Sequence, residues 1–251
     1  MTSFLYRMPQ GIPGDITRQS MSTIEAQVLD GSNAFPGYGL PGKLNSGKFS
    51  PLVGNETGSQ IYGFLVRPFP TQGVNASDAL GTSVPKTSGI ADILRRGYIA
   101  VKNNSGTAAI GAPVYTRVAA ASGGKPIGGI EAAADASVAG GVITGTGTGT
   151  IAATIGNAAT VVPGTWSLIL LATSATAAVQ VVDPLGIRHP DAKVGTAYSS
   201  GGLNFTITNG GTMTTGDSFS PVVTANTVAI PNATFMSAAD ASGNVEIGYN
   251  I

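Results

Sequence analysis

Glycine and threonine alternate between Ile143 and Ile151, and this spacing invites comparison with a loop that binds phosphate. The glycines stand at positions 145, 147 and 149. A phosphate-binding loop follows a strand and opens a helix whose backbone N–H groups face the ligand. The residues that follow here, TIAATIGNAATVVPG, contain neither a lysine nor a capped helix. The alternation therefore predicts a structural connector and not a nucleotide site.

His189 is the single histidine, and it stands between Arg188 and Pro190 in a segment typical of a turn. Catalysis by a Ser-His-Asp arrangement would need a nucleophile beside it, and the sequence offers neither a GxSxG motif nor an obvious partner. The chain has no cysteine, which excludes a cysteine nucleophile and a thiolate zinc site. We therefore expect no catalytic residue, no cofactor and no metal site.

The acidic residues are scattered along the chain. A polysaccharide hydrolase would need two carboxylates near each other in a groove. The candidates Asp183, Asp191 and Asp217 all fall in expected turns, where aspartate normally binds its own backbone. The segment from Asp240 to Glu246, DASGNVE, lacks the ligand spacing of a calcium loop and predicts a hairpin turn.

Charged residues make up only 10% of the 251 residues, against about 25% in an ordinary soluble domain. Thirteen basic residues balance thirteen acidic ones, so a free monomer would have little net charge to oppose association. The densest basic cluster is Arg95 with Arg96, which is too little for binding to nucleic-acid phosphates. No apolar run is long and uninterrupted enough for a membrane span. We expect a protein that packs against copies of itself or a larger surface, with no nucleic acid and no membrane as partner.

Short runs rich in β-branched and aromatic residues, bounded by Gly, Pro, Asn or Ser, predict a mainly β fold. The clearest runs are 20–29, 61–69, 97–103, 113–120, 165–172, 177–183, 192–199, 203–208 and 217–224. The tail from Thr227 onward predicts two more strands joined around Ser242 to Asn244. Pro231 places the first of these two strands at a sheet edge.

One short helix is expected near residues 89–96. Ser88 can act as the N-cap, and Gly97 ends the turn. The apolar residues that would share one helical face are Ile90, Ile93 and Leu94.

Composition changes near Val142, where charge nearly vanishes, and the earlier composition returns after Asn226. We interpret this as a discontinuous parent domain, barrel-like or sandwich-like, at 20–136 and 226–251. It would hold an inserted antiparallel β-sandwich at 137–225, because insertions succeed at exposed turns. The Thr-Gly alternation is then expected at the entrance to the insert.

Residues 1–19 mix proline and glycine with apolar side chains, a combination that breaks regular structure yet offers groups to bury. They predict an extended N-terminal arm that lies on a neighbouring molecule.

Several segments of the parent domain carry a family pattern: IEAQVLDGSNAFPGYGLPGKL, GIADILRRGYIAVKN, GGIEAAADA and NTVAIPNATFMSAADASGNVEIGYNI. They resemble the structural cement, or head decoration, proteins of tailed bacteriophages. In the insert the segments are GTGTGTIAATIG, VQVVDPLG, VGTAYSSGGLNFTIT and GDSFSPVV. These resemble a small β module of phage head decoration proteins.

The resemblance implies a virion structural protein, not an enzyme, that decorates and cements the outside of an icosahedral capsid. Its partners would be the major capsid protein, whose neighbouring subunits it bridges, and other copies of itself in a trimer or dimer. The arm is the expected capsid clamp, with apolar anchors and charges at the rim. The anchors are Phe4, Tyr6 and Ile12, and the rim charges are Arg7 and Arg18.

Other functions stay open at this point. A capsid-anchored protein could bind a host surface or carbohydrate through the insert, where Trp166 and Tyr198 are the large aromatics able to stack on a sugar. Both aromatics are better explained as core residues of a sandwich. A tail-tube or major shell subunit fits the composition but not the quoted segments.

Overall fold

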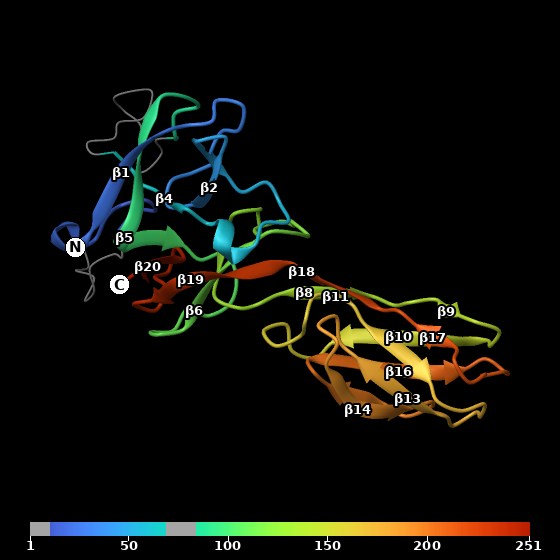
Figure 1. The fold of residues 1–251 in the computed structure, drawn as a ribbon. Coiled ribbons are helices and arrows are strands. Elements are labelled where there is room, and N and C mark those ends of the chain that lie inside the picture. Colours follow the sequence, from blue (N-terminus) through green and yellow to red (C-terminus); the bar gives the residue numbers. More distant parts are fainter. Residues whose placement is uncertain (1–10, 69–83) are drawn as a thin grey trace. The chain divides into compact units, whose positions relative to one another are not determined.

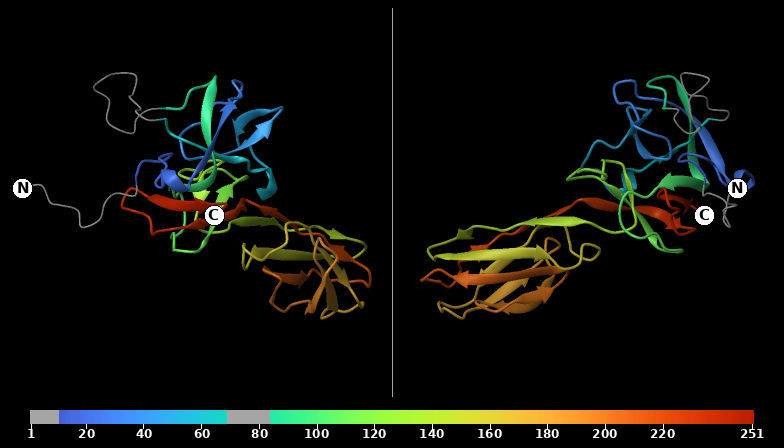
Figure 2. Two further views of the ribbon diagram at one scale, coloured as in Figure 1. Left: turned by 60° about the vertical axis from the view of Figure 1, so that its left-hand side comes forward. Right: turned by 180° about the vertical axis from the view of Figure 1, so that it is seen from behind.

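The chain forms two compact units that consist mainly of β-strands. The computed structural model describes residues 11–68 and 84–251 (Figure 1 and Figure 2). Unit 1 consists of Met1–Ala134 together with Thr227–Ile251, and unit 2 consists of Asp135–Asn226.

Unit 1 is built on one nine-stranded antiparallel sheet. Its strands are β1 (Thr23–Val28), β2 (Pro41–Asn45), β3 (Lys48–Pro51), β4 (Gly63–Leu65), β5 (Ile90–Lys102), β6 (Pro113–Arg117), β7 (Ile130–Glu131), β19 (Thr227–Phe235) and β20 (Asn244–Tyr249). The order is β3-β2-β4-β5-β20-β19-β6-β7, and β1 pairs with β5. The C-terminal strands β19 and β20, red in Figure 1, therefore lie between β5 and β6.

Two short 3-10 turns are the only helical elements among the described residues: η1 (Gln19–Met21) and η2 (Gly58–Gln60).

The long strand β5 corrects one sequence prediction. Residues 89–96 were expected to form a helix, but residues 90–96 form the first half of β5, which pairs with both β1 and β4. Ile93 and Leu94 are both fully buried, because they belong to two different apolar clusters. Ile90, which the helix would have placed on the same face, is 68% exposed. Pairing of the backbone with two neighbouring strands outweighs the weak local preference for a helix.

Two apolar clusters form the core of unit 1. The larger includes Phe64, Leu94, Ile99, Phe235 and Ile247, and the smaller includes Phe35, Phe49, Leu65 and Ile93. Leu29 forms a parallel bridge with Phe49, which brings the end of β1 to β3 and curls this part of the sheet toward a barrel. The predicted mainly β fold is confirmed.

Strand β19 corrects a second prediction. Pro231 does not mark an edge, because β19 pairs with β6 on one side and with β20 on the other. The ladder with β6 shifts register between Ala229 and Thr234. Pro231, which has no N–H to donate, lies inside this irregularity, where the ladder with β6 is interrupted. Asn232 follows in the left-handed region, with a φ of 54°.

Unit 2 is an antiparallel sandwich around one core. Its strands are β8 (Ala136–Ala139), β9 (Ile143–Thr144), β10 (Gly149–Ile155), β11 (Gly164–Thr165), β12 (Ser167–Leu170), β13 (Ala178–Val182), β14 (Arg188–Lys193), β15 (Tyr198–Ser200), β16 (Leu203–Asn209), β17 (Ser218–Phe219) and β18 (Val222–Ala225). The sheets have the orders β14-β13-β12-β17-β9, β10-β16-β15 and β11-β18-β8. Trp166 and Phe219 are fully buried in the core that the sheets share.

The Thr-Gly segment lies inside unit 2 and not at its entrance, because β8 precedes it. Residues 145–148 form the connection between β9 and β10. Exposed and half-buried residues alternate along β10, which is the period of a strand with one face toward the core.

Candidate functional site

The described part of the N-terminal segment is fixed to unit 1 by backbone hydrogen bonds. Gly14 donates to the carbonyl of Ala100 at 2.8 Å, and Ala100 donates back to Asp15 at 2.9 Å. Thr17 donates to Tyr98 at 3.2 Å. Residues 14–17 therefore run along the second half of β5 as an additional short ladder. Residues 14–17 are therefore held in place on unit 1 by β5.

Arg18 holds the end of this segment by its side chain. Its guanidinium donates two hydrogen bonds to Glu246, at 3.2 and 3.0 Å, and lies 4.0 Å from the centre of the Tyr98 ring. The Arg18 side chain remains 43% exposed. It is thus committed to β20 and β5 of its own unit, although one side of it faces solvent.

The five residues expected in the capsid clamp have different positions in the structure. Phe4, Tyr6 and Arg7 lie outside the described residues. Ile12 is half-buried, and its N–H donates to the carboxylate of Asp15 at 3.2 Å. The structure brings Ile12 and Arg18 onto the same segment along β5, but not next to each other.

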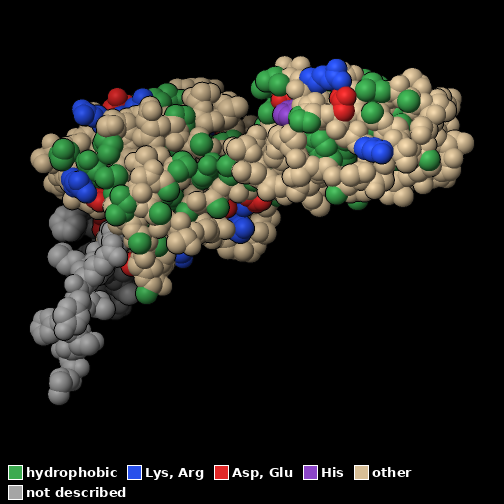
Figure 3. Space-filling view, turned by 90° about the horizontal axis from the view of Figure 1, so that it is seen from below, with side chains coloured by type: hydrophobic (Ala, Val, Ile, Leu, Met, Phe, Trp, Pro, Cys, Tyr) green, Lys and Arg blue, Asp and Glu red, His purple; other side chains and the backbone are tan. Residues whose placement is uncertain are grey.

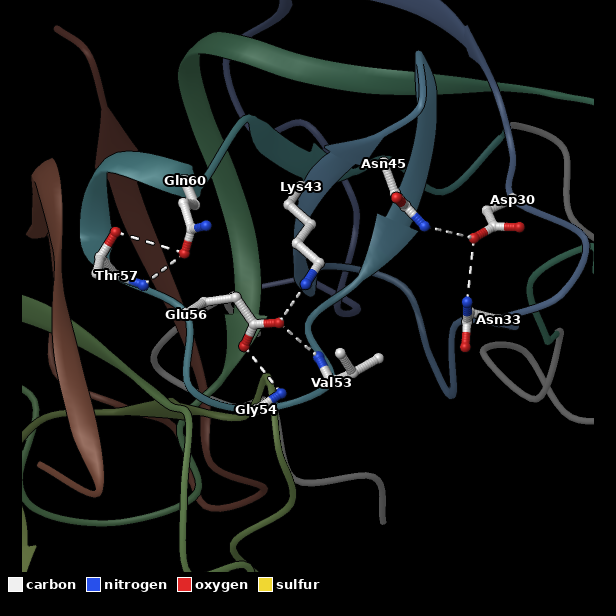
Figure 4. A network of polar contacts seen from close by, with 9 residues as sticks. All are labelled: Asp30, Asn33, Lys43, Asn45, Val53, Gly54, Glu56, Thr57 and Gln60. Atoms are coloured by element: carbon white, nitrogen blue, oxygen red, sulfur yellow. Dashed lines mark hydrogen bonds and ion pairs between the residues drawn. The ribbon is translucent and has the colours of Figure 1, made fainter. Parts of the chain in front are cut away.

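A buried carboxylate organises the loop between β3 and η2 (Figure 4). Glu56 is 3% exposed and accepts hydrogen bonds from Lys43 at 2.6 Å and from the N–H groups of Val53 and Gly54, both at 2.9 Å. Burial acts to raise the pKa of Glu56, but the bond from Lys43 and the two backbone bonds outweigh it and lower this pKa. No prediction from the sequence included Glu56 as a site residue. The capping box of Thr57 and Gln60 beside it was the one local signal for an ordered loop.

Arg117 and Glu131 form a fully buried ion pair that sequence reasoning also missed. Both side chains are 1% exposed, and Arg117 donates two hydrogen bonds to the carboxylate. It also donates to the carbonyls of Ala119 and Ala120, both at 3.2 Å. The pair joins β6 to β7 and has a structural role.

The Thr-Gly segment binds a carboxylate of the protein itself. Asp217, 3% exposed, accepts from the N–H of Thr146 at 2.9 Å and from that of Thr214 at 2.8 Å. A Cβ at Gly145 or Gly147 would lie 2.0 or 2.2 Å from an Asp217 carboxylate oxygen. The glycines are therefore required for close approach of Asp217, and the prediction of a structural segment is confirmed.

His189 lies in β14, where it pairs with Val181 of β13, so the turn predicted at this residue is wrong. Its Nε2 lies 3.3 Å from the Asp183 carboxylate, and its ring stacks on Trp166 with a centre-to-centre distance of 5.1 Å. Asp183 accepts the N–H groups of Leu185 and Ile187, both at 2.9 Å. Burial acts to raise the pKa of Asp183, but the backbone and His189 hydrogen bonds outweigh it and lower this pKa. Asp183 thus orders the turn between β13 and β14, and His189 follows this turn within the strand.

The remaining candidate acids also have local structural partners. Asp191 binds Arg188 at 2.9 Å on the surface. Asp240 accepts the N–H groups of Ser242 and Asn244, both at 2.8 Å, which gives the expected hairpin turn between β19 and β20. Asp240 therefore stabilises a turn, whereas Asp191 lies within β14, and the turn expected at Asp191 is wrong.

The aromatics considered for sugar stacking are buried. Trp166 is fully buried, and its Nε1–H donates to the carbonyl of Val162 at 3.0 Å. Tyr198 is 8% exposed and stacks on Phe205 at 4.5 Å between ring centres. Their interpretation as sandwich core is confirmed.

The surface has few charged groups. The face in Figure 3 carries scattered Lys, Arg, Asp and Glu side chains between wide neutral areas. Among residues 11–68 and 84–251, no group of three or more His, Asp or Glu side chains is placed to hold a metal ion. No helix in these ranges is long and apolar enough to cross a membrane.

The described residues form a mainly β fold, and its buried acids bind loops and strands of the chain itself. The model of the XM1 gp53 minor capsid protein family matches residues 1–249. The chain belongs to this family and is a structural protein of a phage virion. No curated protein and no solved structure matched the chain.

Replacement of Glu56 by glutamine is expected to destabilise unit 1 by about 1–3 kcal/mol at neutral pH, because a charge-assisted bond is lost in a buried site. The pKa of Glu56 is lowered from its usual value of 4.5, so its contribution is fully present above that value. It is lost as the pH falls through the lower folded pKa. Urea unfolding of the unaltered protein and of Glu56→Gln between pH 7 and pH 3 measures how the difference in free energy of unfolding depends on pH.

The control for this experiment is Asp191→Asn, which removes an exposed ion pair and should change stability by at most about 1 kcal/mol. A Glu56→Gln difference that stays constant down to pH 3 would contradict the assigned role of the carboxylate.

Replacement of Gly147 by alanine is expected to destabilise unit 2 by about 1–3 kcal/mol, because the new methyl group overlaps the Asp217 carboxylate. Gly123→Ala is the matched control, since a Cβ there meets no atom within 4 Å. Thermal unfolding gives the melting temperatures of both variants. Equal melting temperatures for the two variants would show that the segment does not depend on close approach of Asp217.

Proposed function

We propose that this protein decorates and cements the outside of an icosahedral phage capsid, where it bridges neighbouring major capsid subunits. The observation that carries the proposal is the match of nearly the whole chain to a minor capsid protein family. The neutral composition supports it, because a protein that works by packing has little need of a charged surface.

The physical basis is the sum of many modest contacts. A standard protein interface buries roughly 1,600 Å². If each copy contacts two neighbouring capsid subunits, dissociation at one contact leaves the other in place, and this multivalency resists loss of the protein and separation of the subunits. No reactive side chain is required for such a function.

The N-terminal arm is the proposed capsid clamp. Residues 14–17 are bonded to β5, so a clamp formed by the residues before them would start from a fixed point on unit 1. Phe4 and Tyr6 would insert as apolar anchors, and Arg7 would contribute at the rim. Arg18, bound to Glu246, acts in this scheme mainly by holding the base of the arm.

Unit 2 is proposed to be a separable module. The N–H of Asn226 donates to the carbonyl of Asp135 at 2.9 Å, so the two ends of the unit lie side by side. A short connection between Ala134 and Thr227 can therefore replace it. In this scheme unit 1 carries the contact with the capsid.

Substitution of both Phe4 and Tyr6 by alanine is expected to weaken binding to purified shells that lack the protein by roughly tenfold or more, because two aromatic anchors are lost. Co-sedimentation with such shells measures the affinity. Thr2→Ala with Ser3→Ala is the control within the same segment, and it should bind as the unaltered protein does. Unchanged affinity of the aromatic double variant would exclude the arm as the clamp.

Deletion of residues 135–226, with a short glycine connection, is expected to leave shell binding unchanged within about threefold, a change of less than about 1 kcal/mol. Circular dichroism first verifies that the shortened protein is folded. If the folded deletion variant no longer bound shells, unit 2 would have to carry the capsid contact.

A further inference from the structure

Unit 1 has an open hollow of about 330 Å³ that is lined from β2, η2, β5 and β20. This volume lies at the lower end of the range for ligand pockets. None of the described residues that line the hollow is acidic. Its polar lining consists of Lys43, Ser59, Gln60, Tyr62, Arg95 and Tyr249. The hollow therefore presents mainly hydrogen-bond donors.

The guanidinium of Arg95 has a fixed position in this hollow. It lies 3.5 Å from the centre of the Tyr62 ring, and its Nε lies 3.5 Å from the carboxylate of Glu25. The Tyr62 hydroxyl donates to the same carboxylate at 2.6 Å. An aromatic ring thus holds the guanidinium from one face, and a carboxylate holds it from one edge.

The hydrogen-bonding capacity of Arg95 is largely unused. The two terminal nitrogens of a guanidinium carry four N–H donors. In Arg95 none of them donates to a described residue. The side chain is 30% exposed, so these donors can be reached from solvent. A preordered guanidinium with free N–H groups is the donor that binds a carboxylate or a phosphate in a bidentate manner.

Two neutral donors of the same hollow also lack partners. The Oε1 atom of Gln60 accepts the N–H of Thr57 at 2.8 Å, whereas the amide nitrogen of Gln60 donates to no described residue (Figure 4). The hydroxyl of Tyr249 has no partner among the described residues either, although Tyr249 is only 5% exposed. Its ring is fixed edge-on against Phe64, with 5.2 Å between ring centres. An unpaired polar group on a buried side chain calls for a partner from outside the chain.

The charges around the hollow suit a ligand with a single negative charge. Lys43 donates to the carboxylate of Glu56 at 2.6 Å, and Arg95 is paired with Glu25. Because each cation already has a carboxylate partner, little net positive charge remains for a dianionic phosphate. Leu44, which also lines the hollow, is 42% exposed and can contact the methylene groups of an acidic side chain.

We propose that this hollow binds the carboxylate of an acidic side chain on a neighbouring protein. Arg95 donates two parallel N–H bonds to the carboxylate, and Gln60 and Tyr249 donate to its remaining lone pairs. A protein partner is favoured because the chain belongs to a family of minor capsid proteins, which associate with other capsid components. The inference does not depend on the proposed N-terminal clamp, and its test needs no capsid shells. Its failure would leave the proposed capsid binding intact.

The first test titrates the full-length protein with the peptide acetyl-Gly-Glu-Gly-amide. The readouts are the NMR signals of the Gln60 side-chain amide and of the Arg95 Nε–H group. Both signals should shift to saturation, with a dissociation constant on the order of 1–10 mM. The control peptide acetyl-Gly-Gln-Gly-amide has nearly the same size and no charge. It should bind at least about tenfold more weakly, because the charged acceptor is lost.

The second test uses two variants and a matched control for each. Arg95→Lys keeps the positive charge but loses the planar fork, and it should weaken binding of the glutamate peptide by about tenfold or more. Tyr249→Phe removes one neutral hydrogen bond and should weaken binding by about two- to tenfold. Arg188→Lys and Tyr115→Phe change residues that do not line the hollow, and both should bind as the unaltered protein does. Circular dichroism verifies that each variant is folded.

Three results would overturn the proposal. They are the absence of saturable shifts at Gln60 and Arg95, equal affinity for the glutamate and glutamine peptides, and unchanged affinity of the folded Tyr249→Phe and Arg95→Lys variants. Should Arg95→Lys fail to fold, Tyr249→Phe decides alone, since it deletes only a hydroxyl group. Tighter binding of inorganic phosphate than of the glutamate peptide at equal ionic strength would overturn the choice of a carboxylate.

Discussion

Buried carboxylates that accept hydrogen bonds from backbone N–H groups hold the irregular parts of this protein in place. Glu56, Asp183 and Asp217 each bind two backbone N–H groups of a loop, and each is at most 5% exposed. A chain with 36 glycines has many loops that would otherwise be costly to order. A buried carboxylate is stable only when such partners compensate for its lost hydration. Loop structure and acid placement therefore depend on each other.

Because acidic side chains are used to hold loops inside the protein, they contribute little charge to its surface. Several of the thirteen acidic residues stabilise the fold, among them Glu56, Glu131 and Asp217, which are all buried. The surface that results presents mainly small neutral side chains and scattered apolar ones. Such a surface is suited to packing against other proteins, which agrees with membership of a minor capsid protein family.

Local sequence patterns predicted the features that depend on local interactions. Alternating and β-branched runs indicated most long strands, and the turn roles of Asp183, Asp217 and Asp240 followed from residue type. The pair of Arg117 and Glu131 could not be predicted, because the two residues meet only through the pairing of β6 with β7.

The predictions of a helix at residues 89–96 and of a sheet edge at Pro231 were wrong, because contacts with distant residues decide the structure there as well. Residues 89–96 satisfy a helical pattern, yet β1 and β4 offer hydrogen bonds on both sides of this segment. Pro231 suggested an edge, but an irregularity in the ladder accommodates it within the sheet. In both cases partners distant in the sequence determine the structure, and a local pattern contains no information about them.

Electron cryomicroscopy of virions that carry the protein, compared with virions that lack it, tests whether the protein decorates and bridges the capsid. We expect additional density on the outer surface of the shell, with each copy in contact with two neighbouring major capsid subunits. Density confined to the interior of the shell, or copies that each contact a single capsid subunit, would contradict it.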